Sequence, residues 1–188
     1  MREISESKSV SSHPVSYDDG YEAYSVSGLS QGETDSSSTN YATINFSRGE
    51  GAETEIFYNF DFNIPTGATI TSVTCTAKCY ISNTNSSRIS TRTVQLYSGT
   101  TAKGTAYTVS NSTNEFSITP GSWTAAELNN AKIRLYAVRG SSNTTTNYYY
   151  RFYGATIEVD YSLDTYAYAV TATSTAVNVN NVEVSSND

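Results

Sequence analysis

The two cysteines and the single histidine are residue types that can serve as nucleophile, base or zinc ligand. Cys75 and Cys79 lie in segment 70–82, ITSVTCTAKCYIS, where apolar and polar residues alternate from residue 73 onward. This alternation predicts a half-buried antiparallel strand that points both thiols toward the core. Four residues of extended chain place the two Cα atoms roughly 13 Å apart, beyond the ~7 Å limit for a disulfide bond. We therefore expect two free, buried thiols that pack as small apolar side chains and hold no zinc.

The histidine, His13, lies next to Pro14 in a Ser-rich N-terminal segment. A Ser-His-Asp or Cys-His site requires a base that is held rigidly beside its nucleophile. An extended or disordered arm does not hold a base in this way. We therefore do not expect His13 to take part in catalysis.

Two groups of acidic residues have types that could bind calcium or hydrolyse a glycosidic bond. Asp18 and Asp19, followed by Glu22, could supply oxygen ligands to calcium, but adjacent acids beside a glycine also form turns, and we favour a turn. A glycosidase needs two carboxyl groups that face each other across a cleft. We expect a solvated loop rather than such a pair from the remaining group, Glu50, Glu53 and Glu55.

Charge and composition argue against two classes of partner. The 188 residues carry a net charge of -7, whereas binding a phosphate backbone needs clustered Lys and Arg, so no nucleic-acid partner is expected. No apolar run approaches the ~20 residues that cross a membrane, and the N-terminus lacks the apolar segment of a secretion signal. Together with two unpaired thiols, these features predict synthesis in a reducing cytosol.

The elements that would position these residues are strands. A composition rich in Tyr, Thr, Ser and Asn predicts an all-β fold with polar loops. About eight strands at regular spacing predict a two-sheet antiparallel β-sandwich of jelly-roll type, and an immunoglobulin-like strand order stays open. The expected strands are 41–48, 54–62, 70–82, 88–98, one or two within 106–118, 132–139, and a last strand at 148–161 that is bent or bulged around Gly154.

Around this sandwich we expect an N-terminal arm at residues 1–16, the sandwich itself at 17–161, and a C-terminal tail or linker at 162–188. Residues 99–104 are expected to form a turn. Thr124 and Glu127 have the spacing of a capping box, which predicts one short helical turn at 124–129. Trp123 precedes this turn, and we favour a buried anchor at the end of the core over a sugar-stacking platform.

The densest aromatic segment is 148–153, YYYRFY, in the last expected strand. One face of this strand must help to build the core. The other face would display Tyr149, Arg151 and Tyr153, which are residue types enriched at protein interfaces and on sugar-binding surfaces. Three roles stay open for this face: contact with a neighbouring subunit, recognition of a ligand, or plain surface cover.

Three segments, FDFNIPTGATITSVTCTAKCYI, GSWTAAELNNAKIRLYAV and YRFYGATIEVDY, resemble in this order the jelly-roll domain of structural proteins from tailed bacteriophages and Firmicutes prophages. In that family a Phe-rich strand runs into an Ile-Pro-x-Gly-Ala-x-Ile turn, a Trp-Thr segment precedes a late strand, and the domain closes on an x-Val-x-Tyr strand. The resemblance covers approximately residues 40–161, and carbohydrate-binding sandwich modules share the Ile-Pro-x-Gly-Ala turn. Its motifs are structural, so it implies a fold and carries over no catalytic residue.

The resemblance implies a non-enzymatic virion structural protein: a capsid decoration, or a subunit of a fibre, collar or baseplate appendage. Such a protein would be made in the cytoplasm of the bacterial host and assemble through its arm and sandwich faces. Its expected partners are other capsid or tail components and further copies of itself, with a trimer as one arrangement. The alternative is a carbohydrate-binding module that attaches to host-surface glycans through Tyr149, Arg151, Tyr153 or Trp123. Neither interpretation requires a cofactor or a metal ion.

Overall fold

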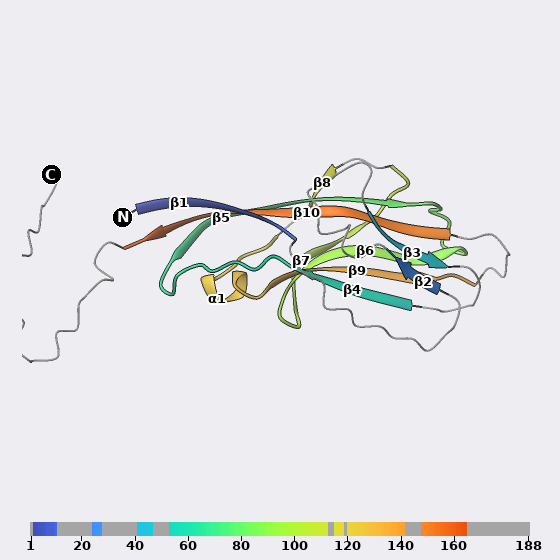
Figure 1. The fold of residues 1–188 in the computed structure, drawn as a ribbon, viewed down its shortest axis with the longest axis horizontal. Coiled ribbons are helices and arrows are strands. Elements are labelled where there is room, and N and C mark those ends of the chain that lie inside the picture. Colours follow the sequence, from blue (N-terminus) through green and yellow to red (C-terminus); the bar gives the residue numbers. More distant parts are fainter. Residues whose placement is uncertain are drawn as a thin grey trace, which may run out of the picture.

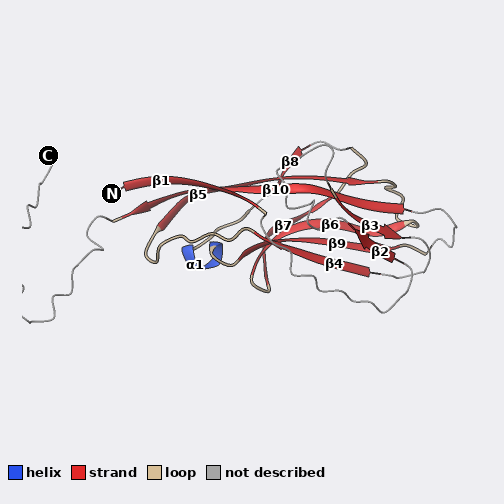
Figure 2. Ribbon diagram, viewed as in Figure 1, coloured by secondary structure: helices blue, strands red, loops and turns tan. Residues whose placement is uncertain are grey.

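The computed structural model describes residues 2–10, 24–27, 41–46, 53–112, 115–118, 120–141 and 148–164. Strands dominate these residues, and one short helix, α1 (Ala125–Leu128), lies among them (Figures 1 and 2). The strands form two antiparallel sheets that enclose one hydrophobic core. The predicted all-β class and two-sheet sandwich are therefore confirmed.

Within the described residues, one sheet has six strands and the other has four. Sheet A has the order β2-β3-β10-β5-β8, and β1 also pairs with β10; its strands are β1 (Arg2–Ser9), β2 (Tyr24–Ser27), β3 (Ala42–Phe46), β5 (Thr69–Ile81), β8 (Glu115–Ile118) and β10 (Tyr148–Leu163). Sheet B has the order β4-β9-β6-β7; its strands are β4 (Glu53–Asn59), β6 (Ile89–Ser98), β7 (Thr101–Thr108) and β9 (Ala131–Arg139).

The strand order from β3 to β10 is that of a jelly roll. From β3 onward the chain passes from one sheet to the other at every step, with the β6–β7 hairpin as the exception. The first and last strands of this series, β3 and β10, are neighbours in sheet A. This is the double-sheet Greek-key arrangement expected from the sequence, and it decides against an immunoglobulin-like order.

The core is built by alternate residues of facing strands. In β5, Cys75, Ala77, Cys79 and Ile81 are buried, while the residues between them are more exposed. On β10 the buried Tyr150 donates its hydroxyl to the carbonyl oxygen of Thr93 in β6, at 3.3 Å. Because Thr93 belongs to sheet B, this hydrogen bond joins the two sheets and satisfies a hydroxyl that would otherwise be buried without a partner.

β10 is the central strand of sheet A and pairs directly with three other strands. Its first part pairs with β3 and its last part with β1, while β5 runs along its other edge. The pairing with β5 is interrupted by a bulge between Phe152 and Gly154, and Gly154 has a φ of 131°, which side-chain-bearing residues rarely adopt. The predicted bulge around Gly154 is therefore confirmed. Figure 1 shows that β1, the start of β5 and the end of β10 extend past the strands of sheet B toward α1.

Four segments form strands that the sequence patterns do not predict. Residues 2–9, expected in an arm, form β1; residues 24–27 form β2; residues 101–104, expected as a turn, belong to β7; and residues 162–163 continue β10 beyond residue 161. Each of these segments pairs with a neighbouring strand, and the ladder hydrogen bonds offset its weak apolar pattern. The expected tail from residue 165 onward lies outside the described residues, and the division of the chain at residues 16 and 161 stays a prediction.

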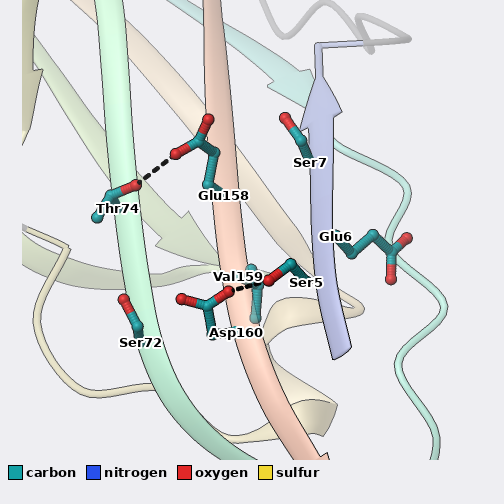
Figure 3. A pocket seen from close by; sticks show the side chains of 8 residues that line it. All are labelled: Ser5, Glu6, Ser7, Ser72, Thr74, Glu158, Val159 and Asp160. Carbon is teal, nitrogen blue, oxygen red and sulfur yellow. Dashed lines mark hydrogen bonds between the residues drawn. The ribbon is translucent and has the colours of Figure 1, made fainter. Parts of the chain in front are cut away.

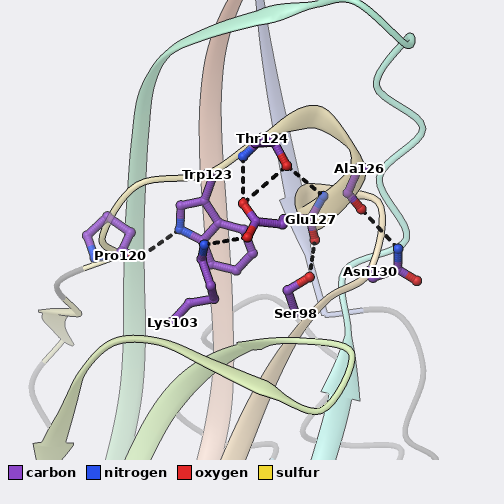
Figure 4. Close-up of polar contacts among 8 residues, drawn as sticks. All are labelled: Ser98, Lys103, Pro120, Trp123, Thr124, Ala126, Glu127 and Asn130. Atoms are coloured by element: carbon purple, nitrogen blue, oxygen red, sulfur yellow. Dashed lines mark hydrogen bonds and ion pairs between the residues drawn. The ribbon is translucent and has the colours of Figure 1, made fainter.

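The predicted helical turn is present, with its capping box. The backbone N–H of Glu127 donates to the Thr124 hydroxyl at 3.3 Å, and the Glu127 carboxylate accepts from the backbone N–H of Thr124 at 2.8 Å (Figure 4). The backbone N–H of each residue thus donates to the side chain of the other. This exchange stabilises the first turn and explains why a helix of one turn forms at this crossover.

Gly140, which follows β9, is expected to resist substitution. A Cβ added there would lie 2.4 Å from the carbonyl oxygen of Ser86 and 2.5 Å from the carbonyl group of Ser87. Because these are backbone atoms, the 83–88 turn or the end of β9 would have to move. We expect Gly140→Ala to lower the free energy of unfolding by about 1–3 kcal/mol, the usual effect of overpacking, in urea denaturation. As a control, Gly99→Asn should cost less, because Asn tolerates its φ of 57° and no atom lies within 4 Å of the added Cβ. Equal losses at the two positions would contradict the steric explanation.

Candidate functional site

Two of the predicted surface residues lie side by side on the outer face of sheet A. Along β10, Tyr150 and Phe152 point into the core and are each 1% exposed. Tyr149 precedes Tyr150, and Arg151 lies between Tyr150 and Phe152 in the sequence. Both side chains are half-buried and point to the opposite face of the sheet. The strand alternation therefore places the large apolar rings in the core and leaves one ring and one guanidinium group on the outer surface.

Neighbouring strands add two tyrosines to this surface. The ring centre of Tyr80, on β5, lies 5.9 Å from that of Tyr149, and the ring centre of Tyr41, which precedes β3, lies 5.2 Å from that of Tyr153. The central carbon of the Arg151 guanidinium lies 4.3 Å from the centre of the Tyr41 ring and 4.4 Å from that of the Tyr149 ring. These five side chains, from three separate parts of the sequence, form the outer aromatic cluster.

The position of the Arg151 guanidinium is fixed by aromatic rings rather than by an acid. Its Nε atom is buried without a hydrogen-bond partner, and no carboxylate among the described residues pairs with it. Contact with two ring faces stabilises the cation and limits its rotation. Burial, together with the neighbouring Tyr149 phenol, raises the pKa of Tyr80, so that its hydroxyl stays protonated at neutral pH. The cluster thus combines hydroxyl groups that can donate hydrogen bonds with a cation that has no acidic partner among the described residues.

Tyr153 contributes to this cluster from beneath its surface. It lies at the β10 bulge and is only 4% exposed, and the Lys78 ammonium lies 5.6 Å from its ring centre. At this bulge the Tyr153 ring packs edge-on against the Tyr41 ring. Of the three residues predicted on this face, Tyr149 and Arg151 therefore keep part of their surface exposed, whereas Tyr153 is buried beneath Tyr41.

Trp123 is not part of this surface. It is 7% exposed and packs with the core cluster, and its indole N–H donates to the Pro120 carbonyl at 2.6 Å. The Lys103 ammonium lies 5.0 Å from the Trp123 ring centre and forms a 2.8 Å ion pair with Glu127, which lowers the pKa of that carboxyl group (Figure 4). This environment agrees with the buried-anchor interpretation. The alternative of a sugar-stacking platform at Trp123 is wrong, because the ring has too little free surface.

A second aromatic surface lies on the outer face of sheet B and was not predicted. The Arg134 guanidinium carbon lies 4.7 Å from the ring centre of Tyr97 and 5.0 Å from that of Tyr136. The Tyr97 ring also meets the Phe57 ring edge-on, at 5.5 Å between centres. Arg134 has an acidic partner, because Glu55 accepts a hydrogen bond from it at 3.0 Å, whereas Arg151 has none within the described part of the chain. The alternation within segments 53–59 and 131–139 could have revealed this surface, but only once β4, β6 and β9 are known to be neighbours.

A shallow pocket of about 330 Å³ lies farther along sheet A, over β1, β10 and β5 (Figure 3). Two carboxylates on β10 face hydroxyl groups on both neighbouring strands: Ser5 donates to Asp160, and Thr74 donates to Glu158 at 3.4 Å. The two carboxylates therefore have a structural role, because each accepts a hydrogen bond from a neighbouring strand. Among the described residues, no three His, Cys, Asp or Glu side chains come together in a way that could hold a metal ion.

The predicted free thiols are confirmed. Cys75 and Cys79 are buried and unpaired, and burial raises the pKa of each to about 12. Both therefore stay protonated at neutral pH and act as small apolar side chains.

The remaining acidic and basic candidates of the sequence do not form a site in the described part of the chain. Glu55 is occupied by Arg134. The single histidine, the three acids of the calcium hypothesis and the first acid of the glycosidase hypothesis lie outside the described residues: His13, Asp18, Asp19, Glu22 and Glu50. No helix among the described residues is long and apolar enough to span a membrane.

Comparisons with known proteins add little to this geometry. No protein-family model matches the sequence, and no curated protein matches it either. One similar solved structure is that of TmCBM61 in complex with beta-1,4-galactotriose, with a TM-score of 0.43, 9% sequence identity, and coverage of 78% of this chain and 88% of that one. A likeness of this extent carries no argument about function. The resemblance to phage jelly-roll proteins, the virion role and the location on a virion stay predictions.

Proposed function

We propose that this chain is a non-catalytic glycan-binding β-sandwich whose ligand lies on the outer aromatic cluster. The observation that carries the proposal is the Arg151 guanidinium, which is held between the Tyr41 and Tyr149 rings without an acidic partner among the described residues. Half-buried tyrosine rings offer apolar faces on which a sugar ring can stack, and their hydroxyl groups can bind sugar hydroxyls. A guanidinium group between such rings can donate several hydrogen bonds in one plane.

The charge of this surface points to an acidic sugar. The cluster contains the cation Arg151, and none of the described outward side chains beside Arg151 on β3, β5 and β10 is acidic. This local positive charge contrasts with the net charge of -7 for the whole chain. A carboxylate on the ligand would complete the coordination of Arg151 by charge-assisted hydrogen bonds. The preferred ligand class is therefore an oligosaccharide that contains a uronic or sialic acid.

Glycan binding is tested first on an array that contains matched neutral and carboxylate-bearing oligosaccharides, and then by calorimetry with the best ligand. We expect Arg151→Ala to weaken binding of the acidic glycan by roughly 10- to 100-fold, which corresponds to the loss of hydrogen bonds to a charged group. Tyr149→Ala should weaken acidic and neutral glycans alike, because it removes a stacking surface rather than a charge.

The matched control is Arg134→Ala, which removes the equivalent aromatic-bound arginine from the other sheet. It should leave glycan affinity unchanged. Circular dichroism of each variant would establish that the sandwich is intact. An array without any bound glycan would overturn the proposal. An equal loss of glycan affinity in Arg151→Ala and Arg134→Ala would contradict the location of the site on sheet A.

A further inference from the structure

One edge of β1 has no strand beside it in the described part of the chain. Residues 2–9 of β1 pair with the last part of β10, and no other described strand of sheet A pairs with β1 (Figure 1). A strand edge of this kind presents a row of backbone N–H and C=O groups that can pair with another strand. The residue order of β1 determines which strand that can be.

The alternation of hydrogen bonds identifies the backbone groups that face this free edge. The N–H of Val10 donates to Ala155 of β10 at 3.1 Å, so the even-numbered residues of β1 direct their backbone groups toward β10. The odd-numbered residues Ser5, Ser7 and Ser9 therefore direct theirs toward the free edge. Their side chains lie on the outer face of sheet A, and Figure 3 shows Ser5 and Ser7 on that side of β1 while Glu6 points away from it.

The sequence of β1 is self-complementary about Ser7. Residues 4–10 read Ile-Ser-Glu-Ser-Lys-Ser-Val, so an antiparallel copy centred on Ser7 places Glu6 opposite Lys8 twice. The same register places Ile4 opposite Val10, Ser5 opposite Ser9, and Ser7 opposite its own copy. Because the odd positions form the hydrogen-bonded pairs, Glu6 and Lys8 would form the non-hydrogen-bonded pairs, in which facing side chains approach most closely.

Neighbouring registers lack this match. Centring the pair on residue 6 would place two Glu6 carboxylates opposite each other, and centring it on residue 8 would do the same with two Lys8 ammonium groups. Like charges that face each other across a strand pair are destabilising. Charged side chains on an edge strand normally discourage pairing with other chains, so this residue order leaves one favourable partner, a second copy in one register.

We propose that two copies of this protein associate through β1, antiparallel and centred on Ser7, so that sheet A continues across a two-fold axis. In a single copy Glu6 and Lys8 already lie 3.6 Å apart and keep 26% and 41% of their side-chain surface exposed. They are therefore accessible for exchange of partners. The interface is isologous, as a closed symmetric dimer requires. It leaves the outer aromatic cluster free, and so does not depend on glycan binding.

Charge reversal tests this dimer by sedimentation velocity over a range of protein concentrations. Glu6→Lys or Lys8→Glu alone would place like charges opposite each other twice, and we expect the dissociation constant to rise by roughly tenfold or more. The double variant Glu6→Lys with Lys8→Glu restores both opposite-charge pairs and should restore the dimer. This variant is the matched control, because its composition equals that of the natural chain. A wild-type protein that stays monomeric at every concentration, or forms trimers, would overturn the proposal.

Oxidative cross-linking tests the register itself. Directly opposed residues in a hydrogen-bonded pair have Cα atoms about 5.5 Å apart, within the range of a disulfide bond. Ser7→Cys should therefore form a covalent dimer under mild oxidation, while Ser5→Cys and Ser9→Cys should do so only when the two variants are mixed. Cys75 and Cys79 will not interfere, because both are buried. Cross-linking of Ser5→Cys with itself would contradict the register centred on Ser7.

Discussion

Phe152→Ala is expected to lower the free energy of unfolding by about 3–5 kcal/mol, the loss typical of a fully buried ring. Phe152 is 1% exposed, and its ring centre lies 4.9 Å from that of Tyr58 in sheet B. Its directly paired neighbours in sheet A are Ala42 and Cys79, which are small. Neither can expand into the space that the ring leaves, so a cavity would remain between the sheets.

The adjacent substitution Arg151→Ala is the control for this prediction. It removes a large side chain from the same strand but from the outer face, where contact with two half-buried rings contributes about 1 kcal/mol. Urea denaturation followed by circular dichroism measures both variants. Similar losses at the two neighbouring positions would contradict the assignment of inner and outer faces to β10.

The second large effect is expected at alkaline pH. Burial raises the pKa of both Cys75 and Cys79 from 9.0 to about 12, so the folded protein keeps protons that the unfolded chain releases. The contribution of the thiols is therefore fully present below pH 9 and is lost as the pH rises toward 12. By pH 10, which is still below both folded values, the loss is about 1.4 kcal/mol per thiol, or about 3 kcal/mol for the two.

Comparison with the variant Cys75→Ala and Cys79→Ala isolates this effect from the titration of Tyr and Lys side chains. The free energy of unfolding is measured between pH 8 and pH 10 for both proteins, and the natural chain should show the steeper decline. Parallel declines would mean that the thiols are accessible in the folded state. Thiol reagents offer an independent check, since neither cysteine should react at neutral pH until the protein is unfolded.

Much of the fold follows from local patterns in the sequence. Alternation in β5, β9 and β10 identifies their inward faces, because one side of each strand must be apolar. The capping box of Thr124 and Glu127 identifies α1, and Gly154 marks the bulge of β10. Each of these signals depends on residues that are close in sequence, and each is confirmed.

The candidate site was predicted only in part, because its members meet through strand order. Tyr149 and Arg151 share a strand, so alternation places them on one face. Tyr41 and Tyr80 join them because β3 and β5 flank β10, and no local pattern gives that order. β1 was missed for a related reason: its alternate residues include Glu6 and Lys8, so it lacks the apolar face by which strands are found.

The position of β10 in the sequence affects how the chain can fold. β1 and β3 pair with one edge of β10, and β5 pairs with the other. None of these pairings can form before β10, which begins at residue 148, has been synthesised. During synthesis these earlier strands leave the ribosome without their common neighbour, and the loops that close the sheet span much of the chain. Such non-local pairing raises the entropic barrier to folding, and comparable sandwiches fold in milliseconds to seconds rather than microseconds. The exposed edges of β3 and β5 are therefore the surfaces through which a nascent chain would aggregate, until the last strand closes sheet A.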